Sequence, residues 1–177
     1  QAQELHQEKS RTASKGLFKG GLADSSEMSV KYHTATHLLL VALRKVLGDH
    51  VEQKGSNITP ERLRLDFSNE TKLTPEQIEE VENIVNDAIK QELEVTYEEK
   101  SKNKAVRIIE ENASVASFMD KYGDTVKLYY VGPKEKPFSV EICNGPHIQN
   151  TKELSNINIV KQENVGAGIK RIKAVLK

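Results

Sequence analysis

Two stretches of the chain place apolar side chains at three- and four-residue steps, and each stretch predicts a helix with one buried face. The first covers residues 29–48 and ends at a glycine, a common helix terminator. The second covers residues 75–93. Here Thr74 is the expected N-cap, Pro75 the first helical residue and Gln77 the partner of Thr74 in a capping box.

Alternation of apolar and polar residues predicts the strands. Residues 51–68 are expected to form two strands joined by a turn at residues 54–57, and residues 103–119 a helical or mixed region. Five further strands are expected over residues 95–101, 125–132, 138–143, 157–166 and 168–177. Helices packed on a mostly antiparallel sheet define an α+β fold. We expect a helical or loop lead-in over residues 1–28 and one domain over residues 29–177.

The composition limits the class of protein. Lys and Arg together number 26, as do Asp and Glu, so the overall charge does not favour general binding to polyanions. A balanced total is still compatible with a local basic patch on one face. The single cysteine excludes an internal disulfide and fits a reducing compartment. No apolar run is long enough to cross a bilayer and nothing resembles a signal peptide, so we expect a soluble cytoplasmic protein without a membrane partner. The chain starts without Met in a polar, helical stretch, which predicts a piece of a larger protein.

Two short motifs far apart in the sequence carry the candidate chemistry. His33 and His37 are four residues apart on the first predicted helix, so their imidazoles share one face and can converge on a metal ion. Cys143 and His147 flank the turn of residues 144–146, which lets both side chains point to the same side. Three imidazoles and one thiolate form a ligand set that suits Zn²⁺ better than Mg²⁺ or Ca²⁺. The sequence therefore predicts a zinc site.

Other interpretations of these motifs stay open. The two helical histidines can be one core residue and one surface residue. Cys143 and His147 can form a nucleophilic dyad, although a dyad leaves the helical pair unexplained. His6 and His50 lack a comparable pairing and are expected to be solvated. A closed set of four protein ligands is typical of structural zinc, whereas catalysis requires a position for water or substrate, and spacing does not distinguish the two.

The two motifs, HxxxH on a helix and CxxxH far downstream, are also where the chain resembles a known family. It is similar to the editing domain of alanyl-tRNA synthetase and to the free-standing relatives of that domain, which share the "second additional domain" with threonyl-tRNA synthetase. The resemblance covers nearly the whole chain. Besides the two motifs it is carried by FKGGLAD (18–24), HTATHLLLVALRKVLGDHVEQKGSNI (33–58), RLRLDFS (62–68), LTPEQIEEVENIVNDAI (73–89) and VGAGIKRIKAV (165–175).

The resemblance implies zinc-dependent hydrolysis of the ester that joins a wrong amino acid, Ser or Gly, to the 3′ end of tRNA(Ala). A synthetic pocket for alanine cannot strongly reject an amino acid that only adds a hydroxyl, so a second site must remove the mistakes. Thr36 matches the family position that contacts the serine hydroxyl, and Gln53 matches a position lining the pocket. Alternatively, Thr36 bonds to a carbonyl of its own helix and Gln53 is an exposed turn residue. Zinc is expected to hold the substrate's amino group or to polarise a water.

The resemblance further implies two partners: a tRNA bound by its mischarged acceptor end, and the rest of a parent alanine–tRNA ligase chain. Arg64, Gly166, Gly168 and Arg171 are the expected contacts with tRNA or substrate, because basic side chains can hold phosphates and glycines allow a close approach. A solvated strand face and a hairpin turn are the alternatives. Residues 144–146, Asn-Gly-Pro, look like the threonyl version of the motif. A threonyl-type substrate is therefore one alternative function, and a tRNA-binding module with a purely structural zinc is another.

Overall fold

The computed structural model describes residues 22–112, 114, 116 and 119–177. The helices and strands in this part of the chain follow one another as α2 (Glu27–Leu47), β1 (Gln53–Thr59), β2 (Arg62–Ser68), α3 (Pro75–Lys90), β3 (Val95–Ser101), α4 (Lys102–Glu111), η1 (Met119–Lys121), β4 (Thr125–Val131), β5 (Ser139–Ile142), η2 (Thr151–Glu153), β6 (Ile157–Gly166) and β7 (Ile169–Leu176). Among the described helices, none combines the length and the apolar character that spanning a membrane requires.

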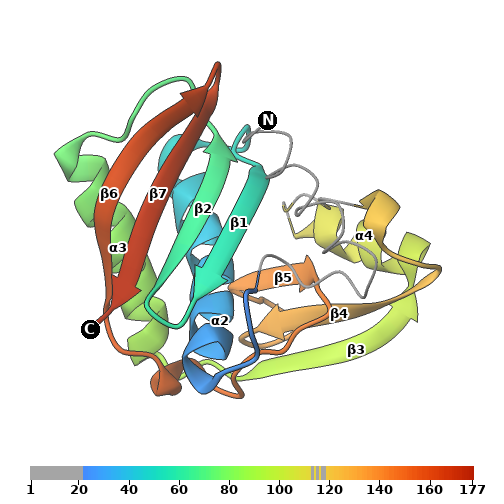
Figure 1. Cartoon of the computed structure of the whole chain (residues 1–177). Helices are drawn as coiled ribbons and strands as arrows, with labels where there is room; N and C mark the ends of the chain where they lie inside the picture. The colour runs from blue at the N-terminus through green and yellow to red at the C-terminus, as the bar shows by residue number, and fades with distance from the viewer. Residues whose placement is uncertain (1–21, 113, 115, 117–118) are drawn as a thin grey trace, which may run out of the picture.

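The strands form two antiparallel sheets. The larger sheet has the order β1-β2-β7-β6, and the smaller has the order β3-β4-β5. Helices α2 and α3 cover one face of the larger sheet, and α4 packs on the smaller sheet (Figure 1). Helix α2 contacts β1 and β2 of the larger sheet and β5 of the smaller sheet. Side chains of α2 that point toward β5 therefore lie close to the smaller sheet and its loops. The expected α+β fold with mostly antiparallel pairing is confirmed.

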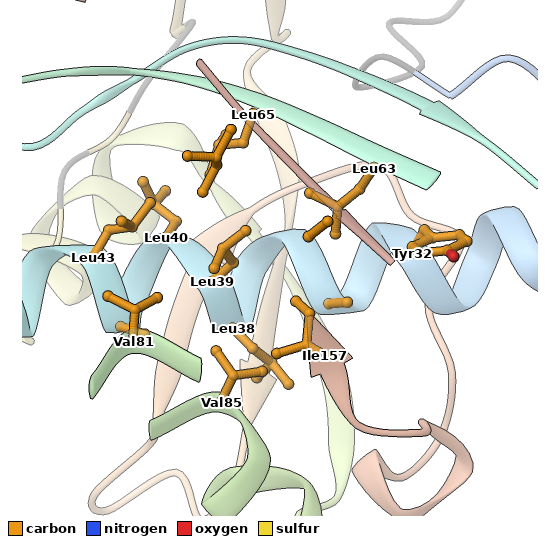
Figure 2. Packing of buried hydrophobic residues seen from close by; sticks show 14 of the residues in the cluster. Tyr32, Leu38, Leu39, Leu40, Leu43, Leu63, Leu65, Val81, Val85 and Ile157 are labelled. Atoms are coloured by element: carbon orange, nitrogen blue, oxygen red, sulfur yellow. The ribbon is translucent and has the colours of Figure 1, made fainter. Parts of the chain in front are cut away.

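The core explains why α2 is held firmly. Figure 2 shows Leu63 and Leu65 of β2 on one side of this helix and Val81 and Val85 of α3 on the other. Leu38 of α2, which is fully buried, belongs to the same cluster. Because both sides of α2 pack against apolar neighbours, the remaining polar residues on the helix are fixed in position and direction.

Both strongly periodic helices form where the pattern predicts them. Ser26 caps α2 by accepting a hydrogen bond from the Ser29 amide, and the helix ends before Gly48. The capping box at the start of α3 is present, with the Thr74 side chain bonded to the Gln77 amide and the Gln77 side chain bonded back. This helix ends at Lys90, three residues earlier than expected.

The turn expected at residues 54–57 is wrong. These residues lie within β1, and the chain reverses instead at Pro60 and Glu61. Gly55 marks an irregularity in the pairing of β1 with β2 rather than a turn. Proline fixes φ near the value needed early in a β-turn and lacks the amide that a strand would use, so Pro60 suits the reversal better than the glycine does.

The mixed region expected over residues 103–119 begins with a regular helix, α4, which ends at Glu111. The helical or loop lead-in expected over residues 1–28 lies for the most part outside the described residues, as does most of the segment 18–24. Within the described part, Leu22 bridges to Ile58 of β1 and α2 begins at Glu27.

Candidate metal centre

One cluster in the described part of the chain brings together the four residues of the two motifs. His33 and His37 come from successive turns of α2, and Cys143 and His147 come from the loop after β5. Each offers one ligand atom, and these four atoms lie within 4.8 Å of one another. His33 and Cys143 are buried, with exposed fractions of 3% and 5%. The fold therefore joins residues that are more than 100 positions apart in the sequence.

The loop that carries Cys143 and His147 has a conformation that needs glycine. Gly145 has a φ of +71°, and a Cβ at this position would lie 2.5 Å from the hydroxyl oxygen of Tyr129. The Gly145–Pro146 peptide is cis. The Gly145 amide donates to Cys143 Sγ at 3.3 Å, so the turn also supplies a donor to the sulfur. The Asn-Gly-Pro sequence thus allows Tyr129 to pack directly over the loop.

Two distances within the cluster are close to those between the ligand atoms of a tetrahedral ion. Cys143 Sγ lies 3.3 Å from His33 Nε2 and 3.4 Å from His147 Nε2. In a tetrahedral zinc site with bond lengths of about 2.0–2.1 Å to nitrogen and 2.3 Å to sulfur, the two ligand atoms are roughly 3.6 Å apart. The donor chemistry of the three histidines and the cysteine suits zinc, and the two sulfur-to-nitrogen distances are close to the tetrahedral value.

The outer ring nitrogen of each histidine has its own partner. His33 Nδ1 lies 2.9 Å from the carbonyl oxygen of Pro146. His147 Nδ1 lies 2.9 Å from Thr34 Oγ1, and His37 Nδ1 is paired with the carboxylate of Glu141. With Nδ1 engaged outside the cluster, each ring has its Nε2 left for the interior. Such outer partners orient metal ligands and fix their tautomers.

Burial and the neighbouring charges set the protonation states in the cluster. Burial raises the pKa of the Cys143 thiol, but the charge of His33 and the hydrogen bonds from the histidines outweigh it, so this pKa falls well below its usual value. Burial lowers the pKa of His147 to about 3. The thiolate and the neutral imidazole are the forms that bind a metal.

His37 differs from the other ligands. Burial lowers its pKa, but the carboxylate of Glu141 and the thiolate of Cys143 act in the opposite direction and raise it to about 10. A metal that binds at His37 Nε2 must therefore displace the proton on that nitrogen. The Nδ1 nitrogen stays bonded to Glu141.

Two cavities lie beside His147. A small one, of about 10 Å³, is lined by Thr34, His37, Tyr129 and His147 among others, and is about as large as one water requires. A much larger open cleft, of about 840 Å³, is lined by Tyr97, Tyr129 and His147 among others. Tyr129 and His147 line both cavities, so the wide cleft reaches the cluster at His147.

The two residues expected in the pocket occupy different places. Thr36 is buried on α2 and its hydroxyl donates to the Tyr32 carbonyl at 2.8 Å, which is the helix-internal bond considered as its alternative. Gln53 is half-buried at the start of β1 and pairs with Phe67, a core residue. Neither residue lines the two cavities beside His147.

The residues expected to contact tRNA lie on the larger sheet, away from the cluster. Arg64 and Arg171 alternate with core residues, so their side chains are on the face turned away from α2. Arg171 binds Asp66 through two hydrogen bonds of 2.7 and 2.9 Å. Gly166 and Gly168 lie at the β6–β7 hairpin, where Gly168 has a φ of +69° and its carbonyl accepts from the Asn69 amide.

Three residues of the site were not found by sequence reasoning: Thr34, Tyr129 and Glu141. Strand alternation could have found Glu141, because it lies two residues before Cys143 and so shares its face. Thr34 follows directly after a ligand and reads as an ordinary helical residue. Tyr129 reaches the cluster only through the pairing of β4 with β5, where it lies opposite Glu141.

Thr34 gives a direct test of the outer contacts. Its hydroxyl accepts from the Ile148 amide, donates to the Val30 carbonyl and lies 2.9 Å from His147 Nδ1, so it joins α2 to the ligand loop. We expect Thr34→Val to weaken zinc affinity by about 10- to 100-fold, and Thr34→Ser to retain most of the affinity. Competition with a chromogenic chelator measures both dissociation constants. Equal affinities for the valine variant and the unmodified chain would show that this contact does not orient His147.

Comparison with known proteins gives a consistent result. A family model described as "Threonyl and Alanyl tRNA synthetase second additional domain" matches residues 126–173. Over 172 residues, or 97% of its length, the chain is 51% identical to an alanine–tRNA ligase of Treponema denticola. It is 46% identical over 174 residues to that of Treponema pallidum, and 43% identical over 151 residues to that of Thermoanaerobacter pseudethanolicus. The chain spans 27% of the length of the two Treponema proteins and 16% of the third.

Proposed function

This chain belongs to the alanine–tRNA ligase family, of which it represents the part with the second additional domain, and from that premise we propose that it hydrolyses mischarged Ser-tRNA(Ala) and Gly-tRNA(Ala) with the help of zinc. Residues 29–177 form the editing unit in this proposal, and residues 1–28 lead into it. The reaction belongs to the cytoplasm, where tRNA is charged.

The observation that carries the proposal is the cluster of His33, His37, Cys143 and His147, one member of which, His147, lines a wide cleft. Zinc held by these four residues would supply Lewis acidity for hydrolysis of the ester. A purely structural zinc site does not need an open cleft that reaches one of its ligands. The cleft of about 840 Å³ has the size of a small-molecule site and can admit the end of a single-stranded RNA.

The chain's own residues orient the ligands. Thr34, Glu141 and the Pro146 carbonyl hold the three imidazoles, so the cluster is ordered before substrate arrives. Glu141 is occupied by His37, and the Glu153 carboxylate in the cleft accepts hydrogen bonds from the Gln149 and Asn150 amides. Both carboxylates are therefore already engaged within the protein, and we assign neither as the general base.

Thr36 and Gln53 belong to the proposal as residues that influence which amino acid is removed. Thr36 is 3% exposed and its hydroxyl donates to the Tyr32 carbonyl, so a direct contact with a serine hydroxyl would require α2 to open at this position. Arg64 and Arg171 are proposed to contact RNA phosphates from the outer face of the larger sheet, with Gly166 and Gly168 at its end. From that face they would contact a part of the tRNA other than its 3′ end.

The experiment that tests the proposal compares four substrates. The zinc-loaded chain should release serine from Ser-tRNA(Ala) and glycine from Gly-tRNA(Ala), while Ala-tRNA(Ala) remains charged. Preferential hydrolysis of Ser-tRNA(Thr) would assign a threonyl-type activity instead. Binding of all four tRNAs with every ester intact would identify a tRNA-binding module with a structural zinc.

A further inference from the structure

Tyr97 is an exposed aromatic side chain in the wide cleft. It lies on β3 with 52% of its surface exposed, and in the described part of the chain the other large apolar side chains with comparable exposure are two valines, Val160 and Val165. An aromatic ring this open at the wall of a cleft presents a face on which a flat ligand group can stack. What it binds can be argued from its neighbours.

Tyr97 starts a series of rings that ends at the ligand cluster. It lies directly across from Tyr129 on β4, and the two ring centres are 5.2 Å apart with the planes tilted by 40°. Tyr129 in turn meets the His147 ring edge-to-face at 4.5 Å. A flat group resting on Tyr97 is thus two ring-to-ring steps from a proposed metal ligand.

Positive charge accompanies the aromatic wall. Lys127 Nζ lies 4.8 Å from the centre of the Tyr97 ring, in a cation–π contact that holds the ring in place. Lys152 also lines the cleft. The acidic side chains there are Glu94 and Glu153, and Glu153 is bound to backbone amides. An exposed ring beside lysines favours a nucleobase with its phosphate over an apolar protein segment.

We propose that Tyr97, supported by Tyr129 and Lys127, stacks on the base of the 3′-terminal nucleotide of tRNA while the ester on the same nucleotide lies at the ligand cluster. The inference rests on the proposed editing function and adds to it the subsite for the base. The short path from Tyr97 through Tyr129 to His147 selects the terminal base, since the base and the ester belong to one nucleoside.

The test uses the zinc-loaded chain and a short RNA ending in CCA, with 2-aminopurine as the terminal base and serine joined to the 3′ position by a stable amide. Stacking on an aromatic ring quenches 2-aminopurine fluorescence. We expect quenching with the unmodified chain, and an affinity about 5- to 100-fold lower with Tyr97→Ala. Tyr97→Phe should restore affinity to within about twofold, because the ring is retained. Val160→Ala, which removes an equally exposed apolar side chain on β6, is the matched control.

Kinetics on Ser-tRNA(Ala) give the second measurement. Tyr97→Ala should raise KM with kcat nearly unchanged, as expected for a contact made equally before and during the reaction. Unchanged quenching, affinity and KM in Tyr97→Ala would overturn the inference and indicate that the exposed ring serves another partner, such as a protein surface. If the unmodified chain quenches the probe but leaves Ser-tRNA(Ala) intact, the base subsite stands and the proposed hydrolysis fails. If the unmodified chain releases serine and Tyr97→Ala changes neither quenching, affinity nor KM, the proposed hydrolysis stands and the base subsite fails.

Discussion

Cys143→Ala should weaken zinc binding by more than 100-fold and lower kcat/KM for release of serine from Ser-tRNA(Ala) by roughly a thousandfold. Loss of an outer partner of a ligand already costs about 10- to 100-fold in metal affinity, so loss of the thiolate itself should cost more. The estimate for activity follows from the several kcal/mol that a Lewis acid contributes to a transition state. Zinc content by mass spectrometry of the native protein and single-turnover deacylation measure the two effects.

Two further variants make the result specific. The double variant His33→Ala/His37→Ala leaves two of the four ligands and should bind no stoichiometric zinc, even if three imidazoles retain some zinc in Cys143→Ala. His50→Ala removes a histidine outside the cluster, whose ring bonds to Asn69, and should retain zinc and activity. Full activity in the double variant would contradict the assignment of these residues as ligands.

Leu38→Ala should lower the free energy of unfolding by about 2–5 kcal/mol, because it deletes most of a fully buried side chain in the cluster between α2 and α3. A loss of this size is a large fraction of the roughly 5–15 kcal/mol that stabilises a typical domain. Since α2 also carries His33 and His37, the metal site should lose its preformed geometry as the helix loosens. Urea unfolding followed by circular dichroism measures the difference.

The control for the core variant is Val160→Ala, whose side chain is 56% exposed and should change the free energy of unfolding by less than about 0.5 kcal/mol. Both variants must be compared at one fixed zinc concentration, because a ligand that binds only the folded chain adds to its stability. A change below about 1 kcal/mol for Leu38→Ala would mean that α2 is not anchored as the packing indicates.

Sequence predicted the helices well because their signals are local. The cap at Thr74 and the three- and four-residue spacing are complete within one segment, and the structure contains both the cap and the helix. The turn between β1 and β2 was misplaced because a glycine and a proline competed as turn residues. Gly55 entered a strand irregularity while Pro60 made the turn.

The ligand set was also accessible from sequence, since the spacing within each motif is local and the joint donor set pointed to one metal. The surroundings of the ligands were not. Glu141 reaches His37 because β5 faces α2, and Tyr97 joins Tyr129 because β3 pairs with β4. Such contacts depend on which strands become neighbours, and a single sequence with no local signal for that pairing does not reveal them.

The position of the basic residues was also not predictable from a single sequence. Arg64 and Arg171 are expected contacts with tRNA or substrate, and in the structure they lie on one face of neighbouring strands, where both approach Asp66. Alternation does not say which face the helices cover. The structure places α2 on the opposite face, so these arginines are separated from the metal cluster by the sheet.

The most direct test of the account is a zinc titration of the metal-free chain with Ser-tRNA(Ala) as substrate. Serine release should increase in proportion to added zinc and reach a plateau at one zinc per chain. It should stay at the uncatalysed rate when the double variant His33→Ala/His37→Ala is titrated in the same way. Serine release that is equally fast without zinc, or no release at one bound zinc per chain, would contradict a zinc-dependent editing site at this cluster.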